Sequence, residues 1–389
     1  MAGGLKVEVR LLNGEVVLAS CEDCEHVGLL RQRVAEVLGA PAARVRLLLG
    51  PEALHDAQLL PCLPSAEGLL AVTAVVVKQS PVLTGHGDGI IRRWDLSAET
   101  FGVCALPADS VQGHGGPILA LSTDWSLGRV LSGSADWTLR VWGLRPPGQG
   151  LDCLGVLCGH GAPVATVCAD FEVGRGLSGS EDGTARLWNI HEMFCLATFE
   201  GHHGRPVHAV GMALGAGARW ALSAGRDARL HVWDLASRQL HGHLDGHGNA
   251  VLALCMDAEG ERAVSGSKDR RLRVWDIKAM ACQAALGGHE GPIVAVAADF
   301  GLERALSASE DATLRLWDLA SHACLSVLAD WHGSLSSLSV GHGLQRAVSG
   351  GADGAVTLWD LGGRGRRLAT VEGDADMGCA NAVSIDDSP

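Results

Sequence analysis

Residues 289–318 read HEGPIVAVAADFGLERALSASEDATLRLWD, and this stretch contains the pattern that decides the fold. It opens on His289; Ser307 follows 18 positions later, Asp311 four after that, and Trp317 a further six. The apolar runs between these residues are short and bounded by turn-forming residues, which is typical of buried β-strands. The stretch therefore predicts a compact group of strands joined by tight turns.

The same pattern recurs along the chain. Trp residues stand at positions 94, 142, 188, 233, 275, 317 and 359, and their spacing of 42 to 48 residues is the period of a propeller blade. An Asp stands six residues before each Trp, and a Ser or Thr stands four residues before that Asp. The complete sets are His114, Ser132, Asp136 and Trp142; His160, Ser178, Asp182 and Trp188; His247, Ser265, Asp269 and Trp275; and His289, Ser307, Asp311 and Trp317. His202 or His203 fills the His position in the fourth repeat, and His332 fills it in the seventh.

This pattern resembles that of the WD-repeat family over roughly residues 80–389. The resemblance implies an all-β, seven-bladed β-propeller, with four antiparallel strands in each blade around a central channel. It also implies that Asp, His, hydroxyl and Trp form a hydrogen-bonded tetrad in each blade. Such a network is physically reasonable, because a buried carboxylate at a tight turn needs several donors.

A Ser, a His and an Asp in one unit could be mistaken for a catalytic triad. Seven copies argue against this interpretation, because an enzyme needs one active site. No phosphate-binding Gly loop, nucleophile elbow or metal cluster stands outside the repeat. We therefore expect a protein that is not an enzyme and that carries no cofactor.

The two ends of the propeller segment, residues 79–389, bear on how the ring closes. The first repeat has strands at 81–85 and 90–94 but no Gly-His element before them, whereas residues 380–386 (ANAVSID) form an unmatched apolar strand. We expect strand 380–386 to complete the first blade, which would remove exposed sheet edges. Asp374 would then stand in the tetrad His position, so this blade should have the weakest network. The alternative is that residues 69–77 supply the inner strand and 380–386 begin an eighth blade.

Residues 1–78 do not follow the blade pattern and are expected to form a separate domain. Strands at 7–11 and 16–19 flank an Asn-Gly turn, a helix is expected at 27–38, and strands follow at 44–49 and 69–77. This order resembles ubiquitin, which implies a small α+β (β-grasp) domain. The apolar patch of ubiquitin maps onto Leu12, Leu48 and Thr73.

No Gly-Gly pair follows the last strand of this ubiquitin-like domain, so it cannot be conjugated to a target as ubiquitin is. We expect it to act as a docking module through Leu12 and Leu48, because clustered exposed apolar groups mark partner sites. The alternative is that these two residues pack against the propeller.

Composition excludes several classes of function. The formal net charge is −13 and neither part of the chain is basic, which argues against a nucleic-acid partner. No apolar run reaches 18 residues and the N-terminus lacks a signal-peptide core, so no membrane contact and a location in the cytoplasm or nucleus are expected.

The 12 Cys residues are too sparse for a disulfide scaffold. Four of them recur at one position of the repeat and are expected to be small buried hydrophobes, namely Cys153, Cys195, Cys282 and Cys324. Cys21 and Cys24 form a lone CxxC motif near His26, and without a second pair we expect no metal site there.

Loops and turns at one rim of a propeller tend to carry recognition, since they vary while the blades stay fixed. The candidate partner-binding residues on that rim are Trp137, Glu181, Arg226, Lys268, Glu310, His208 and Leu252. Arg226 and Lys268 form a basic pair flanked by the two glutamates. Trp137 follows its tetrad Asp, where most repeats have a small residue, so it is either a binding anchor or a side chain lying flat against a neighbouring blade.

Together these features predict a monomeric interaction scaffold or adaptor within a complex, with proteins or peptides as partners. The propeller rim would bind one partner and the ubiquitin-like domain would dock a second. Two related alternatives share this organisation: a ribosome-assembly factor of the ubiquitin-like plus WD-repeat type, and a substrate-recognition subunit of a ubiquitin ligase.

Overall fold

The computed structural model describes residues 6–11, 16–18, 27–38, 45–49, 52–53, 69–76, 80–96, 109–145, 150–329, 333–362, 365–371 and 379–385. The chain divides into two compact units, Met1–Gln79 and Ser80–Pro389, and each is described here by itself. Within the described ranges, no helix has both the length and the apolar character needed to span a bilayer.

The first unit contains a five-stranded sheet in the order β2-β1-β5-β3-β4 and one helix. The elements are β1 (Lys6–Leu11), β2 (Val16–Leu18), α1 (Val27–Leu38), β3 (Val45–Leu49), β4 (Glu52–Ala53) and β5 (Leu69–Val76). β1 runs parallel to β5, and the other pairs are antiparallel. Helix α1 buries Val27, Leu30 and Val34, whose spacing places them on one face. Leu48 pairs with Thr73 across β3 and β5, whereas Leu12 lies outside the described residues.

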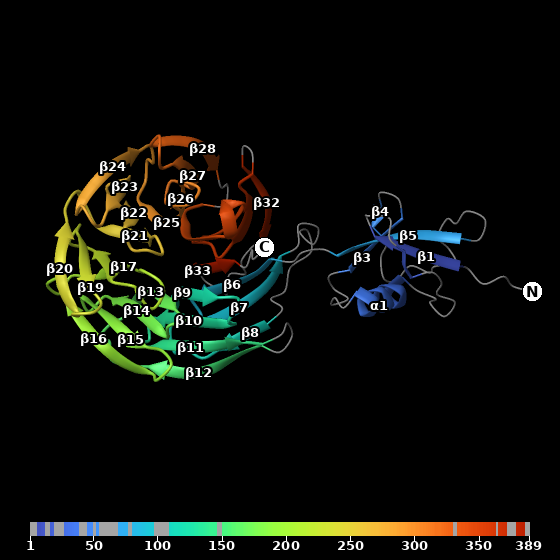
Figure 1. Cartoon of the computed structure of the whole chain (residues 1–389), viewed down its shortest axis with the longest axis horizontal. Coiled ribbons are helices and arrows are strands. Elements are labelled where there is room, and N and C mark those ends of the chain that lie inside the picture. The colour runs from blue at the N-terminus through green and yellow to red at the C-terminus, as the bar shows by residue number, and fades with distance from the viewer. Residues whose placement is uncertain are drawn as a thin grey trace, which may run out of the picture. The chain divides into compact units, whose positions relative to one another are not determined.

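The second unit is a ring of seven four-stranded antiparallel sheets (Figure 1), so the predicted all-β seven-bladed propeller is confirmed. Blade 1 comprises β33 (Ala380–Ile385), β6 (Ser80–His86), β7 (Ile90–Leu96) and β8 (Asp109–Gln112). Blades 2 and 3 comprise β9 (Ile118–Asp124), β10 (Arg129–Ser134), β11 (Leu139–Leu144) and β12 (Leu151–Leu157), then β13 (Val164–Asp170), β14 (Arg175–Ser180), β15 (Thr184–Asn189) and β16 (Phe194–Glu200). Blades 4 and 5 comprise β17 (Val207–Met212), β18 (Trp220–Gly225), β19 (Leu230–Asp234) and β20 (Gln239–Leu244), then β21 (Val251–Met256), β22 (Arg262–Ser267), β23 (Arg271–Asp276) and β24 (Ala281–Gly287). Blades 6 and 7 comprise β25 (Ile293–Asp299), β26 (Arg304–Ser309), β27 (Thr313–Asp318) and β28 (Ala323–Ala329), then β29 (Leu335–Val340), the 3₁₀ turn η3 (His342–Leu344), β30 (Arg346–Gly351), β31 (Val356–Asp360) and β32 (Arg366–Val371).

Blade 1 is assembled from both ends of the propeller segment. β33 pairs antiparallel with β6, with Val383 opposite Thr84 and Ile385 opposite Val82, and the two strands lie side by side in Figure 1. β5 belongs to the sheet of the first unit and not to the ring. Asp374 lies outside the described residues.

The core of the ring lies between the blades. Seven buried apolar clusters each join two neighbouring blades, so that every blade shares one cluster with the blade on either side. The cluster that closes the ring joins Val82 and Trp94 of blade 1 with Val348 of blade 7, and it includes Ile385. The blades approach closely: a Cβ on Gly266 would lie 2.5 Å from the Ile293 side chain of the next blade.

The four repeated cysteines lie on the outer strands of their blades. Cys153 and Cys324 are exposed, and Cys195 and Cys282 are half-buried, so the prediction that they are buried hydrophobes is wrong. The reason is that the fourth strand is the outer edge of each blade, where the pattern of apolar residues does not require burial. In blade 5 the Cys282 thiol lies 3.4 Å from an Arg273 guanidinium nitrogen.

Candidate functional site

A hydrogen-bonded tetrad links the loop, the turn and two strands of blade 2. His114 Nδ1 donates to Asp136 Oδ2 at 2.8 Å, the Ser132 hydroxyl donates to His114 Nε2 at 2.7 Å, and Trp142 Nε1 donates to Ser132 Oγ at 2.8 Å. Blades 3, 5 and 6 repeat these three contacts at 2.7 to 2.9 Å. Each tetrad therefore fixes the turn that carries its Asp against the body of the blade.

Electrostatics keep these tetrads in one protonation state. Burial alone would raise the pKa of Asp136, but hydrogen bonds from Thr138, the Gly115 N–H and His114 outweigh it and lower that pKa to about 2. Burial lowers the pKa of His114 by more than Asp136 raises it, so the ring is neutral at pH 7. Ser132 is completely buried, out of reach of any substrate. The arrangement of Ser, His and Asp is that of a structural support.

Blade 1 builds its network differently. Trp94 Nε1 donates to Thr84 Oγ1 at 2.7 Å, and His86 Nε2 lies 2.7 Å from the same hydroxyl. Asp88 accepts hydrogen bonds from the Arg92 guanidinium. In blade 1 the imidazole therefore comes from His86, at the end of strand β6, and not from a residue before the inner strand. The repeat spacing does not indicate this role of His86.

In blade 7, Trp359 Nε1 donates to Ser349 Oγ at 2.9 Å, and His332 lies outside the described residues. In blade 4 the buried His202 takes the tetrad position, with its Nδ1 2.9 Å from Asp227 Oδ2, whereas His203 is exposed.

The candidate rim residues are held at equivalent places on consecutive blades. The backbone N–H before each tetrad Asp donates to a carbonyl at the start of the inner strand, at 2.9 to 3.0 Å, for Glu181, Arg226, Lys268 and Glu310. All four side chains are exposed, on blades 3, 4, 5 and 6 respectively. His208 and Leu252 occupy β-bulges of the inner strands β17 and β21 and are half-buried. Together with Trp137 on blade 2, we call these seven residues the rim.

Three charged members of the rim, on blades 3 to 5, act electrostatically on the His208 imidazole. Burial lowers the pKa of His208, the positive charges of Lys268 and Arg226 lower it further, and Glu181 opposes them. Interactions of this kind require short distances. The rim therefore combines a basic pair with an acidic neighbour around a half-buried imidazole.

Trp137 occupies a turn position with a left-handed backbone. Its φ is +72°, and the equivalent residues Gly89, Gly183, Ala228, Arg270, Ala312 and Gly354 also have positive φ. A bulky residue in this conformation costs about 1–2 kcal/mol relative to glycine. Trp137 is 52% exposed, so about half of its surface is buried and half is left in water.

A cavity of about 700 Å³ lies at the other end of the blades, among the turns between first and second strands. Its walls include Asp124, Asp257, Glu259 and Asp299, together with Trp125 and Phe300, and no Lys or Arg is among the described residues that line it. Such walls suit a cationic group. In the sequence an aromatic residue follows the turn Asp at Trp125 and Phe300, but nothing in a single repeat shows that these turns meet.

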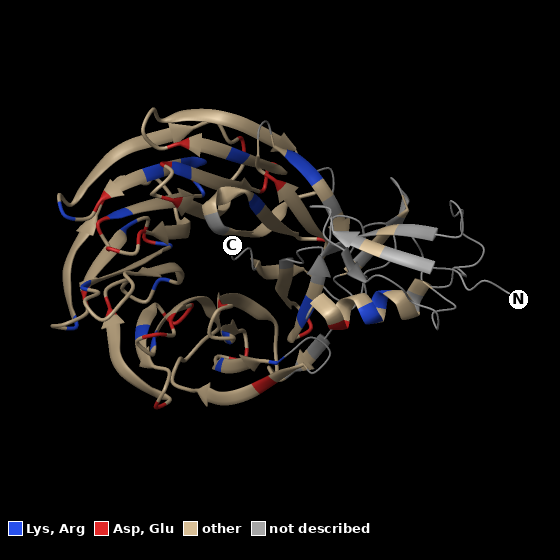
Figure 2. Cartoon of the chain, turned by 45° about the vertical axis from the view of Figure 1, so that its right-hand side comes forward, with Lys and Arg blue, Asp and Glu red and all other residues tan. Residues whose placement is uncertain are grey.

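Two further features bear on ligands. Acidic and basic residues are interspersed along the described strands and turns of the ring (Figure 2). Cys21, Cys24 and His26 lie outside the described residues, and the one group of potential metal ligands inside those ranges is His202, Asp227 and His231.

Comparison with known proteins bears on the ring. A family model described as WD domain, G-beta repeat matches residues 107–143, 151–189, 193–234, 238–276 and 280–318, which together make up half of the chain. Each matched segment ends at the residue directly after a repeat Trp. No curated protein matches the chain.

Proposed function

The chain belongs to the WD-domain, G-beta-repeat family, and from this premise we propose that it is an interaction scaffold whose rim captures a protein or peptide partner. Propellers of this kind present fixed blades and variable loops, and the loops carry recognition. Because a fold does not by itself fix a function, the proposal rests on the rim of this particular chain.

Trp137 is the observation that carries the proposal. The Trp137 backbone is held in the left-handed conformation, which is strained for a bulky residue, and half of its surface is left in water. Strained, exposed residues of this kind are associated with binding, and Trp is among the residues that contribute most to interface energies. Trp137 is therefore the proposed anchor for a partner that also contacts the charged residues of blades 3 to 5.

The substitution Trp137→Gly separates binding from stability. Glycine adopts the left-handed conformation without strain but loses the buried half of the indole, so these opposing effects should leave the free energy of unfolding, measured in urea, within about 2 kcal/mol of the wild type. It should also lose the proteins that the wild-type chain captures from an extract of its own cells. Ala312→Gly, at the equivalent turn of blade 6, is the matched control and should keep those proteins. An unchanged set of captured proteins in Trp137→Gly would contradict the proposal.

The basic pair offers a second variant. Arg226→Ala combined with Lys268→Glu should weaken capture of the same proteins and leave the unfolding free energy unchanged, because both side chains are exposed. Arg367→Ala removes an exposed cation from the outer strand β32 and should have no effect on capture. Equal losses in both variants would indicate non-specific charge attraction instead of a rim site.

For residues 1–78 we propose a ubiquitin-like docking domain that recruits a second partner. The support is the element order, with a helix after the first hairpin and a central pair of parallel strands, β1 and β5. Leu12, Leu48 and Thr73 are the proposed contact residues. Capturing proteins with residues 1–78 and with residues 79–389 separately would test this, and two overlapping sets of partners would contradict it.

A further inference from the structure

Blade 4 departs from the other blades next to its tetrad. Two residues before the repeat Trp, on the third strand, blades 2, 3, 5 and 6 have an arginine (Arg140, Arg186, Arg273 and Arg315), whereas blade 4 has His231. This His231 is 4% exposed and its ring reaches the tetrad carboxylate of the same blade.

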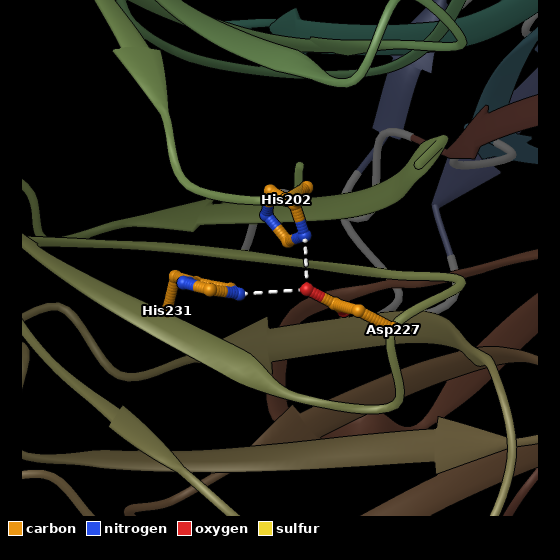
Figure 3. A group of neighbouring side chains, drawn as sticks. All are labelled: His202, Asp227 and His231. Carbon is orange, nitrogen blue, oxygen red and sulfur yellow. Dashed lines mark hydrogen bonds and ion pairs between the residues drawn. The ribbon is translucent and has the colours of Figure 1, made fainter. Parts of the chain in front are cut away.

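Two imidazoles converge on one carboxylate oxygen there. His202 Nδ1 and His231 Nε2 lie 2.9 and 2.8 Å from Asp227 Oδ2, and the two ring centroids are 4.1 Å apart (Figure 3). In blades 2, 3, 5 and 6 the equivalent oxygen accepts a backbone N–H as its second donor, from Gly115, Gly161, Gly248 and Glu290. In blade 4 a side-chain nitrogen takes that place. In blade 1 the Arg92 guanidinium, at the position of His231, also donates to the Asp88 carboxylate, but among the described blades only blade 4 brings two imidazoles to one carboxylate.

We propose that His202, Asp227 and His231 bind one divalent transition-metal ion, with Zn²⁺ as the preferred occupant. Two imidazole nitrogens and a carboxylate oxygen are a donor set that zinc uses, with water or another group in the fourth position. The three donor atoms all lie within 4.8 Å of one another. Asp227 is the most exposed member, with 10% of its side chain accessible, and provides the route by which an ion and its water enter.

The present distances fit an ion after a small adjustment. Zinc lies roughly 2.0–2.2 Å from nitrogen and oxygen ligands, so tetrahedral ligand atoms are about 3.4 Å apart. The His–Asp contacts must lengthen by about half an ångström, which side-chain rotation can provide. The burial of the group favours metal binding further, since the ion would replace two N–H donors around an ionised carboxylate.

The outer contacts of the two imidazoles differ. When an ion occupies Nδ1 of His202, the ring proton moves to Nε2, which is 2.8 Å from the Ser223 hydroxyl and can donate to it. His231 Nδ1 is buried without a partner, so it is unsatisfied with or without metal. The arginines at the same position in blades 2, 3, 5 and 6 also have a buried Nε atom without a partner, so the unpartnered Nδ1 of His231 is not evidence for a metal site. The evidence is the approach of two imidazoles to the Asp227 carboxylate.

Metal titration of the full-length chain tests the proposal. After treatment with EDTA and its removal, calorimetry should show one Zn²⁺ bound per chain, and Zn²⁺ should raise the melting temperature. Co²⁺ should give the visible absorption of a four- or five-coordinate site without thiolate-to-cobalt charge transfer, which excludes the free cysteines as ligands.

His231→Arg is the decisive variant, because it installs the residue that five other blades have at this place. It should fold and lower Zn²⁺ affinity by at least ~100-fold, more than the loss of an outer-sphere contact causes. His231→Gln should do the same if the arginine variant fails to fold. His322→Ala, an exposed histidine on blade 6, is the control and should bind as the wild type does. Absence of stoichiometric binding to the wild type, or binding that persists in both His231 variants, would overturn the proposal.

Discussion

At the scale of single residues, one hydroxyl organises each tetrad. Ser132 Oγ receives the Trp142 indole N–H and donates to His114, while being fully buried itself. A group with two buried partners is expensive to remove, because Trp142 Nε1 and His114 Nε2 then each lose their hydrogen-bond partner in a buried site.

Ser132→Ala should therefore lower the free energy of unfolding by about 2–4 kcal/mol, since each buried polar group left unsatisfied costs about 1–3 kcal/mol. Equilibrium unfolding in urea measures this effect. Ser237→Ala, in an exposed turn of blade 4, should change the same quantity by less than about 0.5 kcal/mol. A loss in Ser132→Ala no larger than in Ser237→Ala would contradict the role of the hydroxyl.

The residues of the tetrads are predictable because they recur at fixed spacing. A Ser 18 positions after a His and ten before a Trp must meet both of them if the strands pair in register, and in blade 2 they do. The repeat spacing does not indicate His231, because it stands where blades 1, 2, 3, 5 and 6 have arginine and blade 7 has Thr357. Nor does the spacing indicate His86, since it serves only blade 1.

At the scale of elements, β33 is the strand on which closure of the ring depends. It contributes Ala380, Val383 and Ile385 to the cluster between blades 7 and 1, and it covers the edge of β6. β33 also contacts the neighbouring blades on both sides: the Ser337 hydroxyl of blade 7 donates to the backbone carbonyl of Ala380, and the Asn381 side chain donates to the Ile118 carbonyl of blade 2.

Deletion of residues 375–389 should abolish cooperative unfolding of the propeller. Burial of each Val or Ile side chain contributes about 1.5–3 kcal/mol, so loss of the strand removes a large part of a total stability of about 5–15 kcal/mol. The measurement is thermal unfolding followed by tryptophan fluorescence and circular dichroism.

A shorter deletion, of residues 386–389, keeps β33 and is the matched control, with an expected unfolding transition like that of the wild type. If the longer deletion also melts in one sharp, unshifted transition, β33 does not hold the ring closed.

Sequence periodicity predicts the strands but not the cavities that form between blades. Blade number and strand order follow from the repeat, since each Trp marks the third strand of one sheet. The acidic cavity among the turns that hold Asp124, Asp257 and Asp299 depends on turns from several blades meeting in space. No single repeat contains that information, so this surface becomes visible only in the assembled ring.

At the scale of the whole molecule, the tetrads make stability depend on pH. The pKa of each tetrad histidine is lowered below 6.5 chiefly by burial, for His114, His160, His202, His247 and His289. The folded state therefore binds fewer protons than the unfolded state below about pH 6.5. Hydrogen bonds outweigh burial and lower the pKa to about 2 for Asp136, Asp182 and Asp311. Between pH 4 and 2 the folded state therefore again binds fewer protons than the unfolded state.

The lowered pKa values of the histidines and of the aspartates both make the folded state less stable in acid, so acidification should destabilise the ring in two stages. The urea midpoint should be nearly constant above pH 7, fall as the pH drops through and below 6.5, and fall again from about pH 4 towards 2. Urea titrations at closely spaced pH values measure this. A midpoint that rises on acidification between pH 6.5 and 5 would contradict the assignment of neutral buried histidines.

The position of β33 has a consequence for synthesis of the protein. The ribosome releases β6 early, yet the strand that pairs with it follows about 300 residues later. At roughly 5–20 residues per second, the first blade waits about 15–60 s with an open sheet edge. During that interval β6 and β7 can pair with strands of another nascent chain, so the delay before β33 is made favours strand exchange between two chains over closure of a single ring.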